Sequence, residues 1–360
     1  MITDTLIQGL TEQMVKARVD SIDVRPFYFA THFPVEESFD FSWKTLENQV
    51  GRKNVAADIH SDNSSVIRKG RPIFESARGD IPYLAILRKM ERSDLKKYQT
   101  ALALSRDRDA ASLARYWGRD VDFCFNGVQS ELEYIAWKLA SNAGKLEFTT
   151  TTNATFANEF NLDYQVDESM KVKSSVDWSD KSNADIIGDL VKIIELADTK
   201  GIDAKYAFVN KKLMYKICSS EQIIKACSSP LANAANAGQP PTIQDVNVML
   251  SNHPFLNELQ LCVINQKITR EFNDGTMQTG NPFEDDRLVL SATTRLGTTQ
   301  YSLLDESDEA GITTKRKHTT VKKYGQLNPK VEFTLGEADA IPVLDTAYEN
   351  VYLRTDAKDW

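Results

Sequence analysis

The longest amphipathic pattern in the chain lies between residues 107 and 142. Apolar side chains recur there at steps of three and four, with polar or charged side chains between them. This spacing predicts one long helix with a single apolar stripe, roughly 50 Å in length. The segment contains no proline, and Gly144 with Lys145 is typical of a helix end. The stripe consists of Leu113, Trp117, Val121, Cys124, Val128, Leu132, Ile135 and Leu139.

A second group of patterns, between residues 179 and 299, predicts an α/β block. One helix begins at Ser182 with Asp185 and another at Thr242 with Asp245, both pairs typical of a capping box. Short helices are predicted at 211–218 and 221–227. Runs of β-branched and aromatic residues predict strands, and the Asp274-Gly275 pair is typical of a hairpin turn. The predicted strands are 205–209, 259–264 and 287–291.

The N-terminal part shows a different organisation. Residues 3–20 have the spacing of a helix, and the aromatic stretch that follows is broken by Pro26 and Pro34, which favours an extended arm that docks on another surface. Residues 48–82 are polar, mixed in charge and punctuated by glycine and proline. We interpret them as a long hairpin that buries little of itself and therefore needs a neighbour.

The tail from residue 301 onward begins with two charged clusters. We interpret the acidic cluster at 305–309 as a solvated loop. The basic cluster at 315–323 is interpreted as an exposed strand, or as a contact with an acidic neighbour. Two strand-like stretches follow, at 331–335 and 342–353.

Composition narrows the class of protein. The chain has 360 residues, of which 41% are hydrophobic, so it can bury a sizeable core. A net charge of −8 argues against a dedicated nucleic-acid binder, although a wall that only encloses nucleic acid needs no basic excess. We expect neither a signal peptide nor a membrane span. The cysteines are expected to be reduced and mostly buried: Cys124, Cys218, Cys227 and Cys262.

Signals for catalysis are nearly absent. The chain lacks the glycine-rich phosphate loops, the HExxH zinc motif and the GxSxG nucleophile motif. The histidines are isolated, without metal-ligand spacing, and we expect them at the surface or at interfaces: His32, His60, His253 and His318. We therefore predict no catalytic, cofactor-binding or metal residues, no cofactor and no enzymatic activity. The exposed hairpin and docking arm instead indicate assembly through unlike patches on sister copies.

The order of these segments resembles the major capsid protein of tailed phages, within the lambda-like capsid protein E family. The resemblance covers nearly the whole chain, although no single motif is specific. It is carried by VRPFYFATHFP (24–34), SSVIRKGRPIFESARGDIPYLAILRKM (64–90), the charged helix and its Gly-Lys end (106–148), VDWSDKSNADIIGDLVKIIEL (176–196), AFVNKKLMYKI (207–217), RLVLSATTRLGTTQYS (287–302) and VEFTLGEADAIPVLDTAYENVYLRTDA (331–357).

The resemblance implies an α+β chain with the tailed-phage and herpesvirus major capsid fold. The implied parts are an N-terminal arm, an extended β-hairpin loop, a peripheral domain built on a spine helix and an α/β axial domain. Their expected limits are 1–45 for the arm, 46–88 for the loop, 89–178 with 300–360 for the peripheral domain, 107–142 for the spine helix and 179–299 for the axial domain.

The implied function is mechanical. Copies would form hexamers and pentamers of an icosahedral shell around double-stranded DNA, without sequence-specific binding and without a membrane. Portal, scaffold and decoration proteins are the expected partners, the virion is the expected location, and the host bacterial cytoplasm is the expected place of assembly. Two alternatives stay open at this point: an encapsulin-like nanocompartment shell, and a cytosolic α/β enzyme with an N-terminal extension.

Overall fold

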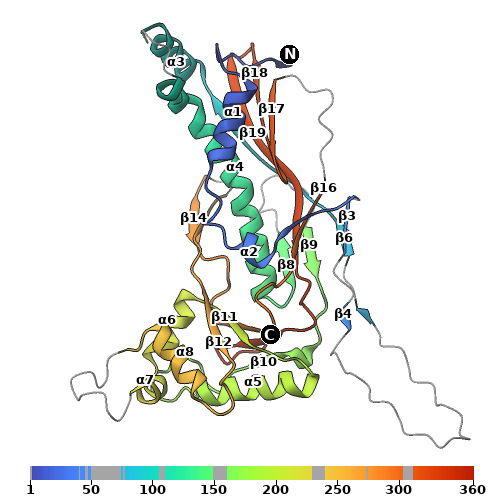
Figure 1. Cartoon of the computed structure of the whole chain (residues 1–360), viewed down its shortest axis with the longest axis vertical. Helices are drawn as coiled ribbons and strands as arrows, with labels where there is room; N and C mark the ends of the chain where they lie inside the picture. Colours follow the sequence, from blue (N-terminus) through green and yellow to red (C-terminus); the bar gives the residue numbers. More distant parts are fainter. Residues whose placement is uncertain are drawn as a thin grey trace, which may run out of the picture. The chain divides into compact units, whose positions relative to one another are not determined.

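A computed structural model describes residues 2–39, 41–44, 48–49, 74–75, 78–104, 110–148, 160–228, 240–272, 275–302 and 311–360. The chain is α+β, as the sequence predicts, and it divides into two compact units, each considered by itself (Figure 1). Unit 1 comprises residues 1–43, 78–135 and 298–343, and unit 2 comprises residues 44–77, 136–297 and 344–360. Most of the hairpin predicted at 48–82, the cluster at 305–309, and His60 lie outside the described residues.

Unit 1 contains a seven-stranded sheet whose central strand is the long β19, Val331–Val343. One side of β19 pairs with β7. Its other partners are β18 and, further along, β16. Strands β1, β2 and β17 extend the sheet beyond these partners. The strands other than β19 are β1 Ile2–Thr3, β2 Val35–Glu37, β7 Tyr83–Met90, β16 Thr298–Ser302, β17 Ile312–Arg316 and β18 Thr319–Gln326.

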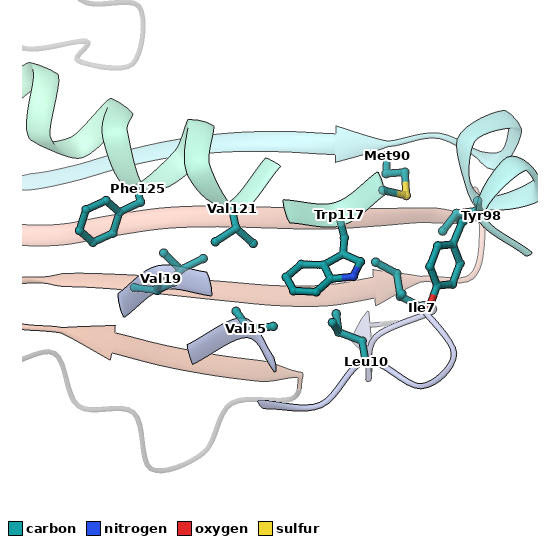
Figure 2. Packing of buried hydrophobic residues seen from close by; sticks show 11 residues of the cluster. Ile7, Leu10, Val15, Val19, Met90, Tyr98, Trp117, Val121 and Phe125 are labelled. Atoms are coloured by element: carbon teal, nitrogen blue, oxygen red, sulfur yellow. The ribbon is translucent and has the colours of Figure 1, made fainter. Parts of the chain in front are cut away.

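Helices of unit 1 cover one face of this sheet. The predicted long helix is α4, Ala110–Ser141, which begins in unit 1 and continues into unit 2. Trp117, Val121 and Phe125 of α4 pack against Val15 and Val19 of α1 over the strands (Figure 2). The other helices are α1 Glu12–Ser21, α2 Phe29–His32 and α3 Arg92–Leu104, and a separate strand pair is formed by β3 Ser42–Lys44 and β6 Arg78–Asp80.

Two glycines allow α4 to lie close to the sheet. A Cβ atom at Gly336 of β19 would collide with the carbonyl oxygen of Cys124 in α4. A Cβ atom at Gly127 of α4 would lie 2.6 Å from the Ile86 side chain of β7. At Gly336 the obstacle is backbone, so glycine is required there by packing, whereas a larger residue at position 127 would displace the Ile86 side chain.

The N-terminal helix begins later than predicted. Residues 3–20 were expected to be helical, but Ile2–Thr3 form β1, and Gly9 adopts a positive φ of 80° before α1 starts at Glu12. The Thr11 side chain accepts a hydrogen bond from the amide of Met14 and caps the helix. The apolar spacing of residues 6–10 reflects packing of an irregular segment, since Ile7 and Leu10 are also buried.

Unit 2 is an α/β unit around a five-stranded sheet, in the order β10, β20, β15, β11, β12. Its strands are β10 Lys171–Lys173, β11 Tyr206–Asn210, β12 Gln260–Ile264, β15 Arg287–Ser291 and β20 Val351–Arg354. Its helices are α5 Ile186–Lys200, α6 Lys211–Ser219, α7 Glu221–Cys227, α8 Ile243–Ser251 and the 3₁₀ turn η1 Glu168–Met170. Small strand pairs are β8 Lys145–Phe148 with β9 Phe160–Asp163, β13 Ile268–Glu271 with β14 Met277–Gly280, and β4 Asn48–Gln49 with β5 Phe74–Glu75.

Two expectations differ from this arrangement. The capping box at Thr242 and Asp245 is confirmed, but α5 is capped by Asp185, which accepts from the amide of Gly188, and not by Ser182. The predicted peripheral segment 300–360 is divided at Val343. Strand β20 pairs with β15 and β10 inside the sheet of unit 2, so residues 344–360 belong to that unit.

We expect Trp117→Ala to lower the free energy of unfolding by about 3–5 kcal/mol, because it empties a large buried site between α4 and α1. Arg119→Ala, at an exposed position on the same helix, should change it by less than about 0.5 kcal/mol. Urea denaturation of the unassembled subunit measures both values. Equal effects of the two substitutions would contradict the packing described for α4.

Candidate assembly surfaces

The face of the unit 1 sheet that points away from α4 is partly apolar and open. Side chains alternate along β7, and Ile86 points to Gly127 of α4, so Tyr83 and Leu87 point to the opposite face. Tyr83 is 48% exposed and Leu87 is 51% exposed. Leu87 pairs across the ladder with Leu335, whose side chain is half-buried on the same face. An open antiparallel face is usually polar, so apolar groups here indicate a surface that another chain covers.

A buried ion pair lies on the same face. The Nζ atom of Lys322 is 2.5 Å from Oε1 of Glu337, and the Tyr83 hydroxyl donates to Oε2 of Glu337 at 2.6 Å. Both charged side chains are almost fully buried. Burial and the neighbouring Glu337 raise the pKa of Asp339. The paired charges keep this part of the face neutral and ordered, so it adds geometric specificity to the apolar part.

Strand β7 is also an edge of the sheet. Within the described residues it pairs only with β19, over eight consecutive residues from Tyr83 to Met90. The other side of β7 therefore offers backbone N–H and C=O groups that a partner strand can use. Sequence reasoning did not single out this strand. The available signal was the run YLAIL at 83–87, which is apolar on both faces.

The N-terminal segment is held on the α4 side of the sheet by a buried carboxylate. Glu332 accepts hydrogen bonds from the Thr5 hydroxyl at 2.6 Å and from the Leu6 amide at 2.7 Å. Lys323, on the neighbouring strand, is fully buried and donates to the Thr334 hydroxyl at 2.7 Å. Burial lowers the pKa of Lys323, while Glu332 and Asp120 favour its charged form. These contacts bind the start of the chain to its own subunit.

The predicted docking arm also contacts its own unit. Strand β2 pairs in parallel with β16, and Phe29 and Phe33 are buried. The buried carboxylate of Glu133 in α4 accepts a hydrogen bond from the Phe29 amide at 2.8 Å. The arm is therefore an integral part of unit 1 over its described residues.

The basic stretch at 315–323 was expected either as an exposed strand or as a contact with an acidic neighbour, and Lys322 makes the second through its ion pair with Glu337. Arg316 donates to the carbonyl oxygens of Val19 and Ile22, both at 2.8 Å, and so caps the end of α1. Lys322 and Lys323 are buried in the contacts described above. His318 is also buried, which corrects its expected surface position. Its Nε2 atom lies 3.2 Å from Oε1 of Gln129, and its ring meets Phe29 edge-on.

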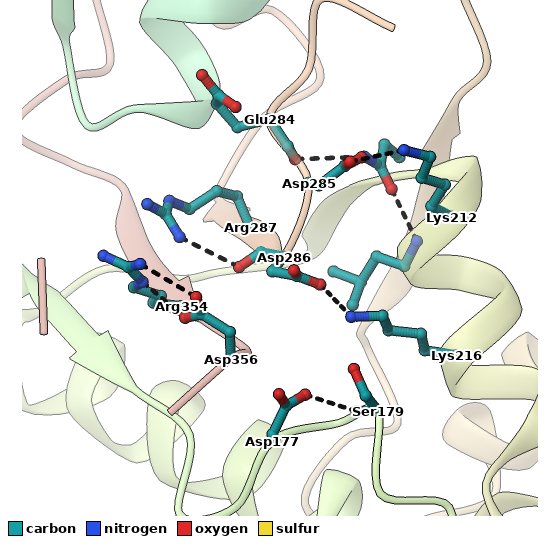
Figure 3. A network of polar contacts seen from close by, with 12 residues as sticks. Asp177, Ser179, Lys212, Lys216, Glu284, Asp285, Asp286, Arg287, Arg354 and Asp356 are labelled. Carbon is teal, nitrogen blue, oxygen red and sulfur yellow. Dashed lines mark hydrogen bonds and ion pairs between the residues drawn. The ribbon is translucent and has the colours of Figure 1, made fainter. Parts of the chain in front are cut away.

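Unit 2 contains a network of charged side chains near the end of the chain (Figure 3). The Asn210 amide and the Lys212 ammonium both donate to the carboxylate of Asp285, each at 2.7 Å. Arg354 pairs with Asp356 and lowers the pKa of that carboxyl to about 2. Lys216 pairs with Asp286, and the guanidinium of Arg287 lies 4.6 Å from the centre of the Trp360 ring, so these contacts tie the end of the chain to β15.

Several exposed apolar side chains of unit 2 lie on its helices and on the loop after α8. Tyr215 of α6 and Val248 of α8 are both at least 60% exposed. Phe255, shortly after α8, has a similar exposure. Single exposed apolar residues are common, but three on neighbouring elements are consistent with a second contact surface.

The described residues offer no evident centre for chemistry. They contain no group of three or more His, Cys, Asp or Glu side chains that could hold a metal ion. The cysteines are free thiols; Cys124 is buried and the other three are half-buried. Burial raises the pKa of Cys124 to about 11, so it is not an activated thiol. Among the described helices, none has both the length and the apolar composition needed to cross a bilayer.

The sheet face is partly apolar and open, the long strand β7 pairs on one side only among the described residues, and helices of unit 2 expose apolar side chains; this combination is typical of a subunit that builds larger assemblies. The fold is that of viral capsid subunits. It is similar over 96% of the chain to a candidate capsid protein of an E. coli CFT073 prophage, with a TM-score of 0.54 and 14% identity, and 99% of that chain is covered. It is similar over 99% of the chain to a capsid subunit of cyanophage A-1(L), with a TM-score of 0.53 and 9% identity, and 97% of that chain is covered.

A third solved structure, a phage-related protein of Bordetella bronchiseptica RB50, has a TM-score of 0.51 at 14% identity and covers 99% of both chains. A comparison with curated proteins finds no match. The sequence profile of phage major capsid protein E matches residues 11–350. The chain therefore belongs to the phage major capsid protein E family, and it is a structural component of a phage virion.

His318 is expected to make stability depend on pH. Burial lowers the pKa of His318 to about 4, whereas an unfolded histidine titrates near 6.5. Between these values the unfolded chain binds the extra proton, so stability is lost as the pH falls from about 6.5 to about 4, by roughly 3 kcal/mol. The His318→Gln variant, which has no titrating ring at this position, should not show this loss of stability between pH 6.5 and pH 4. Urea denaturation of both proteins at several pH values tests this, and a constant difference between them would refute it.

Proposed function

We propose that copies of this chain form hexamers and pentamers that tile the icosahedral head shell of a tailed phage around double-stranded DNA. The observation that carries this proposal is the half-exposed apolar face on β7 and β19, beside the edge of β7 that has no partner strand within the described part of the chain. A covered face of this kind excludes water from apolar groups, and the strand edge supplies directional hydrogen bonds. Membership of the capsid protein E family supports the same function.

A shell needs many contacts that are individually weak. Each subunit presents at least two surfaces in this proposal: the sheet face of unit 1 and the helices α6 and α8 of unit 2. Because the two surfaces differ, the contacts are heterologous and can close into rings. Once several contacts form together, the remaining ones become intramolecular, and the closed shell is far more stable than any pair of subunits.

We assign the parts of the subunit accordingly. Residues 1–45 are the N-terminal arm, and the extended loop, expected at 46–88, ends before β7, whose residues from Tyr83 onward pair with β19 in the sheet of unit 1. The peripheral domain holds the sheet of unit 1 and the spine helix, and the axial domain at 179–299 holds α5 to α8. The pairing of β20 with β15 supports an axial domain that includes the C-terminal strand.

The chain's role in this proposal is structural and not catalytic. Portal, scaffold and decoration proteins are its partners besides sister copies, and the shell is assembled in the cytoplasm of the bacterial host. An encapsulin-like compartment would use the same architecture around a protein cargo. Membership of a phage capsid family supports DNA as the content.

Leu87→Glu is expected to prevent shell formation, because it places a charge at the centre of the proposed contact face. The wild-type protein should form closed, uniform shells in negative-stain electron microscopy, and the variant should remain as small soluble species with an unchanged unfolding transition. Leu327→Glu is the matched control, since this leucine is similarly exposed, at 55%, in the turn after β18. A wild-type protein that forms only a small defined oligomer would contradict the proposal.

Shortening the extended loop should separate folding from assembly. Gln49 of β4 pairs with Phe74 of β5, so an Asn-Gly turn can replace residues 50–73 without changing the ladder. The shortened chain should keep its cooperative unfolding transition, because the loop serves neighbouring subunits, but it should form no closed shells. Calorimetry and negative-stain images measure the two properties. Loss of cooperative unfolding, or normal shells, would refute the role of the loop.

A further inference from the structure

Unit 1 carries a local excess of basic side chains between residues 88 and 122. Residues 88–122 contain nine Lys and Arg against six Asp and Glu, although the whole chain has a net charge of −8. This segment includes the end of β7, all of α3 and the first turns of α4. The local basic excess is opposite to the charge of the rest of the chain, so it requires a separate explanation.

The described acidic residues of this segment are already neutralised within the subunit. Asp120 pairs with Arg88 at 3.2 Å, Glu91 with Lys89 at 3.0 Å, and Asp94 with Lys97 at 2.9 Å. Asp122 pairs with Arg18 of α1. The basic excess therefore remains on four exposed side chains without an acidic partner among the described residues. These are Arg92, Lys96, Arg115 and Arg119, which we call the basic surface.

Tyr116 joins the two helices that carry the basic surface. Its ring lies 6.0 Å from the ring of Tyr98 in α3, edge to face. The guanidinium of Arg115 lies 5.1 Å from the centre of the Tyr116 ring, and its Nη2 atom is 3.3 Å from the Tyr116 hydroxyl. Arg92 and Lys96 lie one turn apart on α3, and Arg115 and Arg119 lie one turn apart on α4. The four cations therefore belong to one packed pair of helices (Figure 1).

We propose that the basic surface contacts the phosphate backbone of double-stranded DNA, and that this side of α3 and α4 faces the interior of the shell. The inference rests on the proposed function, which supplies an enclosed polyanion. It goes further by naming the contact residues and by fixing which face of unit 1 points inward.

The chemistry of the surface favours nucleic acid over a protein partner. Three of its four cations are arginines, whose planar guanidinium groups pair well with phosphate oxygens. Protein interfaces have apolar, charge-depleted centres, whereas DNA-contacting surfaces are strongly positive. The surface lies on helices and carries no paired amides for reading base edges, so the contact is independent of sequence. Four cations give weak, salt-sensitive binding, which lets the DNA move along the wall.

The proposal is tested by measuring how tightly the unassembled full-length subunit binds a 30-base-pair duplex of arbitrary sequence. Fluorescence anisotropy gives the affinity at salt concentrations between 20 and 200 mM NaCl. The variant replaces all four residues by glutamine: Arg92→Gln, Lys96→Gln, Arg115→Gln and Arg119→Gln. We expect its affinity at 50 mM NaCl to fall at least about tenfold, and the slope of log affinity against log salt to decrease by about 3–4.

The matched control changes the net charge equally at exposed lysines of unit 2: Lys181→Gln, Lys192→Gln, Lys211→Gln and Lys267→Gln. Its affinity should stay within about twofold of wild type. If the fourfold variant unfolds, the pair Arg92→Gln and Arg119→Gln replaces it, with half the expected change in slope.

Three results would overturn the proposal: no wild-type binding at 20 mM NaCl, an equal loss of affinity in the control, or tighter binding of polyglutamate than of the duplex. The last result would identify an acidic protein as the partner. Electron micrographs of the same preparations report shell formation independently, so a failure of the proposed shell function is seen separately from a failure of DNA contact.

Discussion

The close contact between helix α4 and the backbone of strand β19 is the constraint on which unit 1 depends. Gly336 removes the side chain that would otherwise separate them, and the Cys124 thiol lies 3.2 Å from the carbonyl oxygen of Thr334. Because the helix is so close, the buried positions of β19 on this face include small residues, among them Thr334 and Ala338. The remaining width of the sheet on this face is filled by α1 and the N-terminal segment.

This arrangement explains why the opposite face is left for other molecules. The helices of unit 1 that form the buried cluster all lie on one face of the sheet. No described helix of this cluster therefore covers the apolar side chains on the other face. Leu87 and Tyr83 are stable in that position only if the exposed apolar area is modest or if another chain buries it. A capsid subunit meets the second condition, and the basic surface on α3 and α4 gives the subunit a distinct inner side.

Much of the fold could be predicted from local pattern. The long helix has a regular apolar stripe, and the capping box at Thr242 and Asp245 is defined by a spacing of three residues. The start of α1 could not be placed, because Ile7 and Leu10 have helical spacing but are buried as part of an irregular segment. The Ser182 cap was misplaced because Asp185 offers the same chemistry three residues later.

The functional surfaces were less accessible to sequence reasoning. The basic stretch at 315–323 was expected as an exposed strand or as a contact with an acidic neighbour. The sequence could not choose between these, because charge alone does not reveal a partner about 300 residues away, such as the end of α1 that Arg316 caps. The open face of β7 was missed since an apolar run predicts burial but not what covers it. The excess charge on α3 and α4 became visible only after the acidic residues nearby were matched with their own ion pairs.

The hydrogen bonds from Thr5 and Leu6 to Glu332 have a consequence for the order of events during translation. Their donors and acceptor are separated by 327 and 326 residues, so Thr5 and Leu6 cannot dock until the ribosome has passed residue 332. Strand β1 likewise waits for β18. A nascent subunit thus lacks the finished sheet of unit 1 until β18 and β19 have been synthesised.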